Sequence, residues 1–487
     1  MKTPSRFLLS GLIGLTAALS PTLSAQVVVL ESKDGRSING EVLGMKKGKV
    51  LVKREDGKTL AIALNLFSPA TQKFVKKKLQ KQQGEAKGKV AAINKALGQP
   101  LFSSGGSLWD EDSRSLANRL EWPKETETRY TSSYRIYVRP TQKYLLAAAS
   151  PRTGVVYGDE DGKVEAVSII YSNKGDSLSN VGSGQDHFTE TGEKIDPNTL
   201  EGSMLYDRKM VRETLSKIFG EPEEQRMQAQ GSKTIKTDRW DWNGHSFLLA
   251  LAKEEYVQLR IVPTEFADAK GRSERISDGA MRERLASCVT QGEKGDVYID
   301  HIPMVDQGPK GYCAPATFER AMRHAGVDSD MYLLATLATD SRGTNTHKLY
   351  DEVAFTTRSK GGRTAREIKL SSLAPRKVAK YIDKGVPILW RMCSLNRYNK
   401  IADERTEQRA NDDSWDTMGP QLAEMAEKNS ERLQARGNYH ICMIVGYNQL
   451  TGEICVSDSW GDGYDRRWIH HLEAEAVSNG AGYVIDL

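Results

Sequence analysis

The chain has 487 residues, of which 38% are hydrophobic and 27% are charged, and its formal net charge at pH 7 is +5. This length exceeds what one ordinary core needs, so we expect a folded, multidomain protein. Because no internal apolar run approaches the ~20 residues that cross a bilayer, a multispan membrane protein is excluded.

The first 25 residues are typical of a secretory signal peptide. Lys2 and Arg6 precede a run of apolar and small residues, and residues 23–25 (Leu-Ser-Ala) form a typical cleavage site. This is the order of regions found in exported proteins. We therefore expect residues 1–25 to be removed. The mature protein would be secreted, periplasmic or in the cell envelope, with no integral membrane segment.

Residues 26–72 predict a small β-barrel. Apolar and polar residues alternate, and turn signals recur at regular spacing, at Asp34-Gly35, Lys47-Gly48 and Asp56-Gly57. Short strands joined by such turns are typical of antiparallel barrels. The segment resembles the SLA-type homology domain, an SH3-like barrel, and its end (LFSPATQKFV) resembles the closing helix of that family. The resemblance implies a binding or spacer module without catalytic residues.

Residues 73–94 are rich in lysine and glutamine, and they predict a charged helix that frays into a linker. Such a run can dock on an anionic surface, but a solvated linker is the more common outcome. Since aromatic residues are not interleaved with these lysines, we expect no nucleic-acid partner.

Residues 95–275 predict an α+β domain. Four apolar runs predict strands, at 134–138, 164–171, 245–251 and 256–262. Asn243-Gly244 predicts a hairpin turn, and a helix over 207–219 should end before Gly220. Three tryptophans are expected in the core or on a sheet face, because reactive side chains do not gather around them: Trp109, Trp240 and Trp242. Two roles for the domain stay open, an inhibitory pro-segment and a docking domain.

The last predicted domain, residues 295–487, contains a helix that begins at a cysteine. Pro315 suits the first turn of a helix that starts at Cys313, and Gly326 is suited to end it. An apolar stripe that includes Phe318 would hold this helix against a core. The positive end of the helix dipole favours a thiolate at its first residue. Cys313 is therefore the candidate nucleophile.

A second segment supplies a base and a carboxylate. Residues 440–447 (HICMIVGY) predict a strand, and the turn at 448–452 returns the chain as EICVSDSWG. In a hairpin folded about this turn, His440 and Asp458 become cross-strand neighbours within reach of a hydrogen bond. An imidazole that deprotonates a thiol, oriented by a carboxylate, is the arrangement that nucleophilic acyl transfer requires.

Gln307 is the candidate oxyanion donor. It lies six residues before Cys313 on a predicted loop, from which its side-chain N–H and the backbone N–H of Cys313 could face one developing charge. A loop glutamine is usually only solvated, but this offset from a helix-start cysteine favours the functional interpretation. Chemistry of this kind needs no metal or organic cofactor.

Together these motifs resemble the papain superfamily of cysteine peptidases, most of all the bacterial branch related to double-glycine-leader (bacteriocin-processing) peptidases. Four shared motifs carry the resemblance: Gln-x5-Cys-x-Pro at 307–315, Gly-x-Pro within KGVPILW at 384–390, His-x5-Gly-Tyr at 440–447 and Asp-x-Trp-Gly at 458–461.

The resemblance covers residues 300–487 and implies an α+β, papain-like peptidase domain that acts on a peptide or protein substrate. Cys313 would be the nucleophile, His440 the base and then the acid, Asp458 the orienting group and Gln307 the oxyanion donor. Trp460 would shield the contact between His440 and Asp458 from water. We therefore expect a secreted cysteine peptidase that forms a thioester intermediate.

The chain departs from this branch at two places. Ala314 stands where the branch usually has glycine, and a charged insertion at 396–437, with a predicted helix at 414–436, could cap the cleft. Two alternatives remain open. One is a catalytically inactive papain-like binding module. The other is a cysteine acyl transferase or amidase of transglutaminase type, whose histidine usually follows its cysteine much sooner than the 127 residues here.

The five cysteines are an odd number for a protein in an oxidising compartment. If Cys313 is free, the other four allow three disulfide pairings: Cys288, Cys393, Cys442 and Cys455. Buried, unpaired thiols are the other possibility, and we expect them for at least two of the four.

Overall fold

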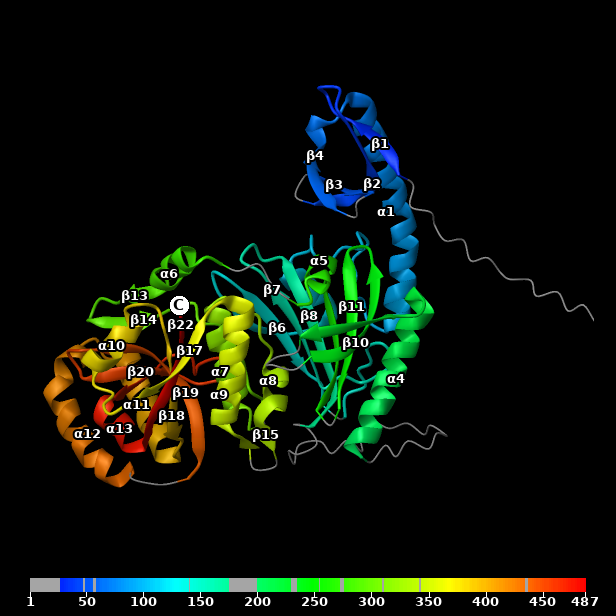
Figure 1. Cartoon of the computed structure of the whole chain (residues 1–487). Coiled ribbons are helices and arrows are strands. Elements are labelled where there is room, and N and C mark those ends of the chain that lie inside the picture. Colours follow the sequence, from blue (N-terminus) through cyan, green and yellow to red (C-terminus); the bar gives the residue numbers. More distant parts are fainter. Residues whose placement is uncertain are drawn as a thin grey trace, which may run out of the picture. The chain divides into compact units, whose positions relative to one another are not determined.

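The computed structural model divides the chain into two compact units, one ending at Glu85 and the other running from Ala86 to Leu487. The structure describes residues 27–46, 49–55, 58–139, 141–174, 199–228, 234–253, 255–271, 276–308, 311–340, 343–433 and 437–487 (Figure 1). The expected signal peptide (1–25) and the expected turns at 47–48 and 56–57 lie outside the described residues.

The first unit contains a four-stranded antiparallel sheet in the order β1-β2-β3-β4. Its strands are β1 (Val28–Glu31), β2 (Ser37–Lys46), β3 (Lys49–Arg54) and β4 (Thr59–Ala63). Val50 and Val52 of β3 are buried while Lys49 and Lys53 are exposed, which confirms the predicted alternation. The 3-10 turn η1 (Leu64–Leu66) and helix α1 (Pro69–Leu97) follow where a closing helix was expected, and Val75 of α1 joins the buried core of this unit.

Helix α1 is continuous where the sequence predicted a fraying helix and a linker. Its last turns explain the difference. Val90, Ile93 and Leu97 recur at helical spacing, and all three are buried in a core of the second unit. An apolar face with a partner stabilises helical turns that the lysine-rich sequence alone would not hold.

The second unit begins with an eight-stranded antiparallel sheet in the order β5-β6-β7-β8-β12-β11-β10-β9, which we call the central sheet. Its strands are β5 (Lys124–Glu127), β6 (Ser132–Tyr137), β7 (Thr153–Gly158), β8 (Val164–Asn173), β9 (Glu223–Gln228), β10 (Thr234–Trp242), β11 (His245–Ala252) and β12 (Tyr256–Pro263). The associated helices are α2 (Ser113–Leu120), α4 (Leu200–Phe219) and α5 (Thr264–Asp268).

The four strands and the hairpin turn predicted in this region are confirmed. Asn243 and Gly244 both have positive φ, 49° and 77°, as a two-residue hairpin turn between β10 and β11 requires. The predicted helix ends at Phe219 as expected but starts earlier, at Leu200, because the Thr199 side chain caps it by accepting a hydrogen bond from the Gly202 N–H.

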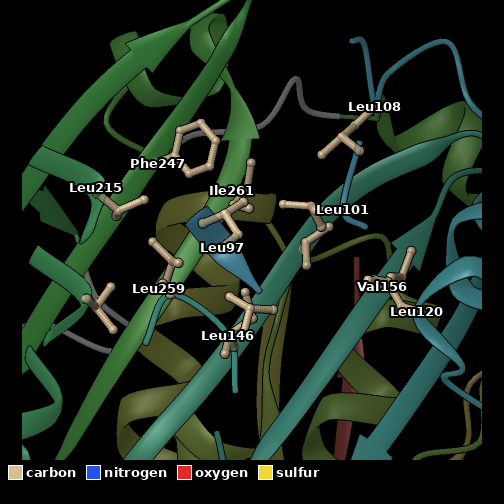
Figure 2. Close-up of a cluster of buried hydrophobic side chains, with 14 of the residues drawn as sticks. Leu97, Leu101, Leu108, Leu120, Leu146, Val156, Leu215, Phe247, Leu259 and Ile261 are labelled. Atoms are coloured by element: carbon tan, nitrogen blue, oxygen red, sulfur yellow. The ribbon is translucent and has the colours of Figure 1, made fainter. Parts of the chain in front are cut away.

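One face of the central sheet carries the largest core of the described chain. Leucines from α1, α2 and α4 pack there against Phe247, Leu259 and Ile261, and Figure 2 shows these side chains pointing into one cluster. Trp240 is buried in this core, and Trp109 and Trp242 pack against it. The interpretation of these tryptophans as core residues is therefore confirmed.

A second antiparallel sheet, the C-terminal sheet, has the order β13-β14-β19-β18-β22-β17, with β20 and β21 continuing from β19. Its strands are β13 (Val289–Gln291), β14 (Asp296–Ile299), β17 (Thr364–Lys369), β18 (Ile388–Cys393), β19 (Tyr439–Asn448), β20 (Glu453–Ser457), β21 (Arg467–His470) and β22 (Ser478–Asp486). A separate pair is formed by β15 (Thr339–Asp340) and β16 (Gly343–Thr344).

Helices cover both faces of the C-terminal sheet. They are α6 (Asp278–Ser287), α7 (Cys313–His324), α8 (Met331–Ala338), α9 (Thr346–Thr356), η3 (Thr357–Gly361), α10 (Pro375–Ile382), α11 (Asn396–Asn411), η4 (Trp415–Met418), α12 (Gly419–Leu433) and α13 (His471–Val477). Residue 295 is the predicted start of this domain, and packing against the C-terminal sheet begins before it. Strand β13 already pairs with β14, and Met281 of α6 is buried in the same core.

Helix α7 lies between the two sheets. Ala314, Phe318 and Met322 pack on the C-terminal sheet, while Ala316 belongs to a cluster that also contains Ile170 of the central sheet. The sequence predicted a single buried stripe. Nearly all of α7 is buried instead, because its polar side also faces protein rather than water.

Charged side chains on the second side of α7 find partners on the central sheet. Glu319 accepts hydrogen bonds from Arg135 (3.4 Å) and Tyr157 (3.2 Å), and Arg323 donates to Thr131 (2.6 Å). These residues are buried, and an unpaired charge there would be costly. The two sheets of the second unit are therefore joined by matched buried charges as well as by apolar contact.

The insertion at 396–437 forms two helices, α11 and α12, rather than the single helix predicted. Arg409 of α11 anchors it. The Arg409 guanidinium lies 3.5 Å from the ring centroid of Trp415 and 3.8 Å from that of Trp468, and it pairs with Asp296 and Glu453.

Among the described residues, no helix is both long enough and apolar enough to cross a bilayer.

Candidate active site

Cys313 is the first residue of α7, and it is half-buried. Tyr312, which precedes the helix, makes no side-chain cap, so the first-turn N–H groups remain directed at the space around Cys313. Pro315 lies in this first turn, where a missing N–H costs nothing. The end of the helix dipole therefore favours a thiolate at Cys313.

His440 and Asp458 meet at the β19–β20 hairpin, as predicted. The Nε2 atom of His440 lies 2.7 Å from Oδ1 of Asp458. The two residues are not directly opposite each other, because Met443 pairs with Ser457 and Asp458 follows the end of β20. The contact is thus diagonal across the hairpin, a distance that an imidazole can span.

Cys313 and His440 form a hydrogen-bonded pair. Burial raises the pKa of the Cys313 thiol, but the hydrogen bond and the charge of His440 outweigh burial and lower it below its ordinary value. Burial lowers the pKa of His440, but Asp458 and Cys313 outweigh it and raise that pKa to about 9. Both shifts favour a thiolate–imidazolium pair.

Asp458 has a second cationic partner, Arg467 of β21. One carboxylate oxygen of Asp458 faces His440, and Nη2 of Arg467 donates to the other at 2.5 Å. The side chains of Asp458 and Arg467 are each only 2% exposed. Burial raises the pKa of Asp458, but His440 and Arg467 outweigh burial and lower that pKa below its ordinary value. The carboxyl group therefore stays ionised.

Helix α11 of the insertion holds Arg467 in place. Asp403 accepts a hydrogen bond from Nη1 of Arg467 at 2.9 Å, and Asn399 accepts one from Nη2 at 3.3 Å. The insertion thus reaches Asp458 through one arginine. Sequence reasoning missed Arg467, since an arginine nine residues after the predicted carboxylate carries no local signal of this contact.

Trp460 lies over His440, as expected for a side chain that shields the His440–Asp458 contact. The two ring centroids are 5.1 Å apart with an interplanar angle of 31°, and Trp460 is half-buried. The guanidinium of Arg467 also contacts Trp460, at 5.1 Å from the centroid of its ring. Aromatic cover of this kind lowers the local dielectric and strengthens the charged contacts beneath it.

Gln307 lies on a loop that is bound to the segment carrying Asp458. Its backbone N–H donates to the Ser459 carbonyl at 2.9 Å. We call residues 304–308 the Gln307 loop. The structure therefore joins the loop of the candidate oxyanion donor to the residue that follows the candidate orienting carboxylate.

Arg320 of α7 is a further residue that sequence reasoning missed. It is buried, and it donates to the Pro303 carbonyl at 3.0 Å and to the Asp458 carbonyl at 2.9 Å. These bonds fix the backbone before the Gln307 loop and at Asp458 to the same helix that begins with Cys313. Its spacing from Cys313 places it two turns along α7, but sequence alone does not reveal its partners.

The other four cysteines are buried and unpaired: Cys288, Cys393, Cys442 and Cys455. Burial raises the pKa of three of them, Cys288, Cys442 and Cys455, whereas that of Cys313 is lowered. Unpaired thiols, rather than any of the three disulfide pairings, are therefore observed. Within the described ranges, no group of three or more His, Cys, Asp or Glu side chains could hold a metal ion.

Part of the C-terminal region matches a known protein family. Residues 299–479 match the model of the Peptidase_C39 like family, and this range contains Gln307, Cys313, His440 and Asp458. A search of curated proteins finds no match to the chain. The first unit and the central sheet lie outside the matched range. The match supports a C-terminal peptidase-like domain of the papain-like cysteine peptidase superfamily.

Proposed function

We propose that this chain is a cysteine peptidase, secreted or held in the cell envelope, that hydrolyses peptide bonds through Cys313, His440 and Asp458. One observation carries the proposal. A buried, ionised carboxylate orients an imidazole that is hydrogen-bonded to a thiol at the start of a helix. The signal-like sequence of residues 1–25 supports the proposed export.

In the proposed reaction the Cys313 thiolate attacks the carbonyl carbon of a peptide bond. The carbonyl oxygen takes the negative charge, next to the Gln307 amide and the Cys313 backbone N–H. His440 then donates its proton to the leaving amine as the C–N bond breaks, which leaves a thioester on Cys313. Neutral His440 next removes a proton from water, whose oxygen attacks the thioester. The C–S bond breaks, and the thiolate and imidazolium are restored.

Alkylation by iodoacetamide at pH 6, followed by peptide mapping, tests the nucleophile. We expect Cys313 to react much faster than the other cysteines, because its pKa is lowered and it is half-buried rather than buried. The four remaining cysteines serve as internal controls. The rate at which the protein hydrolyses a peptide library should fall in proportion to the fraction of Cys313 that is labelled.

Three outcomes would contradict the proposal in different ways. Labelling of Cys313 no faster than that of an ordinary thiol would indicate an inactive binding module. Fast labelling without cleavage of any library peptide would remove the peptidase function. Incorporation of an added amine in preference to water would favour an acyl transferase.

Replacing Gln307 with alanine should lower kcat by about 10²–10³-fold, the usual cost of one oxyanion donor. The rate of Cys313 alkylation should stay unchanged, because His440, held by Asp458, lowers the pKa of the Cys313 thiol. Steady-state kinetics and alkylation of the same preparations check this result. Gln449→Ala, at an exposed position in the β19–β20 turn, is the matched control and should leave kcat as it is. Equal kcat for both variants would remove Gln307 from the oxyanion site.

A further inference from the structure

The Gln307 loop is held by side chains of the central sheet, which lies outside the range that matches the peptidase family. The Thr126 hydroxyl accepts a hydrogen bond from the Met304 N–H at 3.0 Å. Glu125 accepts one from the Asp306 N–H, also at 3.0 Å, and the Tyr137 hydroxyl donates to the Asp306 carbonyl. Both backbone groups of the residue before Gln307 are therefore bound by the central sheet.

Bonds from the C-terminal domain reach the same loop on either side of these contacts. The Gln307 N–H donates to the Ser459 carbonyl, and Arg320 holds the Pro303 carbonyl. Val305, between them, is fully buried in the cluster that contains Ile170 of β8. The Gln307 loop thus lies between the central sheet and the C-terminal domain. Each of the two supplies a different part of the loop's hydrogen bonds.

Two of the three holding residues, Glu125 and Tyr137, make further contacts of their own. Glu125 accepts hydrogen bonds from Arg135 at 2.7 Å and from Ser133 at 2.8 Å, and the side chains of Glu125 and Arg135 are almost fully buried. Burial raises the pKa of Tyr137 well above its ordinary value, so its hydroxyl keeps the proton that it donates. The Tyr137 ring also lies against Gly308, where an added Cβ would come within 3.4 Å of the ring.

We propose that Glu125, Thr126 and Tyr137 are positioning residues for Gln307, and that the central sheet is a permanent part of the oxyanion site. This rests on the proposed function, in which Gln307 binds the oxyanion. A donor misplaced by about 1 Å can cost up to ~10²-fold in rate, so loss of one such contact should be measurable in kcat. A removable inhibitory segment would act in the opposite direction, because loosening it would raise activity.

The test compares two tyrosine-to-phenylalanine variants of the full chain. Tyr137→Phe removes the donor to the Asp306 carbonyl. Tyr171→Phe removes a buried hydroxyl of the same sheet, whose bond at 3.0 Å goes to the Leu146 carbonyl, away from the Gln307 loop. We expect Tyr137→Phe to lower kcat by about 10- to 10²-fold with little change in KM, and Tyr171→Phe to leave kcat near wild type.

Two further readouts separate positioning from general damage. Cys313 alkylation at pH 6 should be unchanged in Tyr137→Phe, since His440 is untouched. A peptide aldehyde, which forms a tetrahedral adduct with the thiol, should bind more weakly in proportion to the loss of kcat/KM. Thr126→Val, which removes the acceptor for the Met304 N–H, should show the same pattern to a smaller extent.

Hydrogen–deuterium exchange gives a readout that does not depend on peptidase activity. Amides of the Gln307 loop should exchange faster in Tyr137→Phe than in wild type or Tyr171→Phe. Equal exchange in the three proteins, equal kcat in the two variants, or higher activity in Tyr137→Phe would each overturn the proposal. Absence of hydrolysis by the wild-type chain would instead refute the proposed function, and the exchange experiment would still decide whether the central sheet holds the loop.

Discussion

Substitution of His440 by alanine should lower kcat by about 10⁶-fold, as much as substitution of Cys313, and the double variant should lose no more than either single one. The reason is that the two residues act as one unit. Without the imidazole there is neither a thiolate at neutral pH nor a proton for the leaving amine. Steady-state kinetics of the two single variants and the double variant would measure this.

The roles of Cys313 and His440 also predict how activity changes with pH. In the wild-type chain, activity should rise as Cys313 ionises, below the ordinary pKa of a thiol, and fall as the pH rises through about 9, where His440 loses its proton. In His440→Ala, alkylation of Cys313 should require the alkaline pH of an unassisted thiol. His347→Ala, at an exposed position on α9, is the control and should retain the wild-type profile. Rapid alkylation of His440→Ala at pH 6 would contradict the assignment.

Arg467→Met should have the second largest effect, on stability as well as on activity. It leaves Asp458 buried with one cationic partner instead of two, and removal of one member of a buried ion pair typically costs about 3–5 kcal/mol. We expect the free energy of unfolding to fall by an amount of this order at pH 7. Peptidase activity should also fall, because the carboxylate loses the bond that fixes its orientation. Denaturant unfolding and kinetics of the same variant would measure both.

Two variants and one change of conditions test the cause. Arg466→Met, at the neighbouring exposed arginine, should change little, and Asp403→Asn should reproduce a small part of the Arg467→Met effect. Because the pKa of Asp458 is lowered in the folded chain, its contribution to stability is present above the unperturbed value of 3.8 and is lost as the pH falls through the folded value. The stability difference between Arg467→Met and wild type should therefore shrink in acid. A difference that is constant with pH would indicate lost packing instead.

Local patterns predicted the elements of the fold well. The alternation in 440–447 places Ile441, Met443 and Val445 in the core next to α7. The turn at Asn243-Gly244 forms as predicted, because asparagine and glycine both tolerate the positive φ that this turn requires. What failed depended on partners far away in sequence. The charges on α7 look like a solvated face until the central sheet supplies Arg135 and Tyr157.

The candidate site divides in the same way. Contact between His440 and Asp458 follows from hairpin geometry, which has a short range, so spacing was enough to predict it. Arg467 could not be predicted, because its role depends on Asp403, which lies in an insertion for which only one helix was predicted. The hold of Tyr137 on the Gln307 loop joins residues 169 apart, beyond the reach of any local pattern.

The position of α7 between two sheets also constrains how this protein can change over generations. Glu319 and Arg323 of α7, together with Asp330, which accepts a hydrogen bond from Ser168, are buried charges for which the central sheet supplies part of the hydrogen bonding. A lineage that exchanged or lost this sheet would have to change these three positions at the same time, since each would otherwise lose a partner that it has in the central sheet. The two sheets are therefore expected to be inherited as a single evolutionary module.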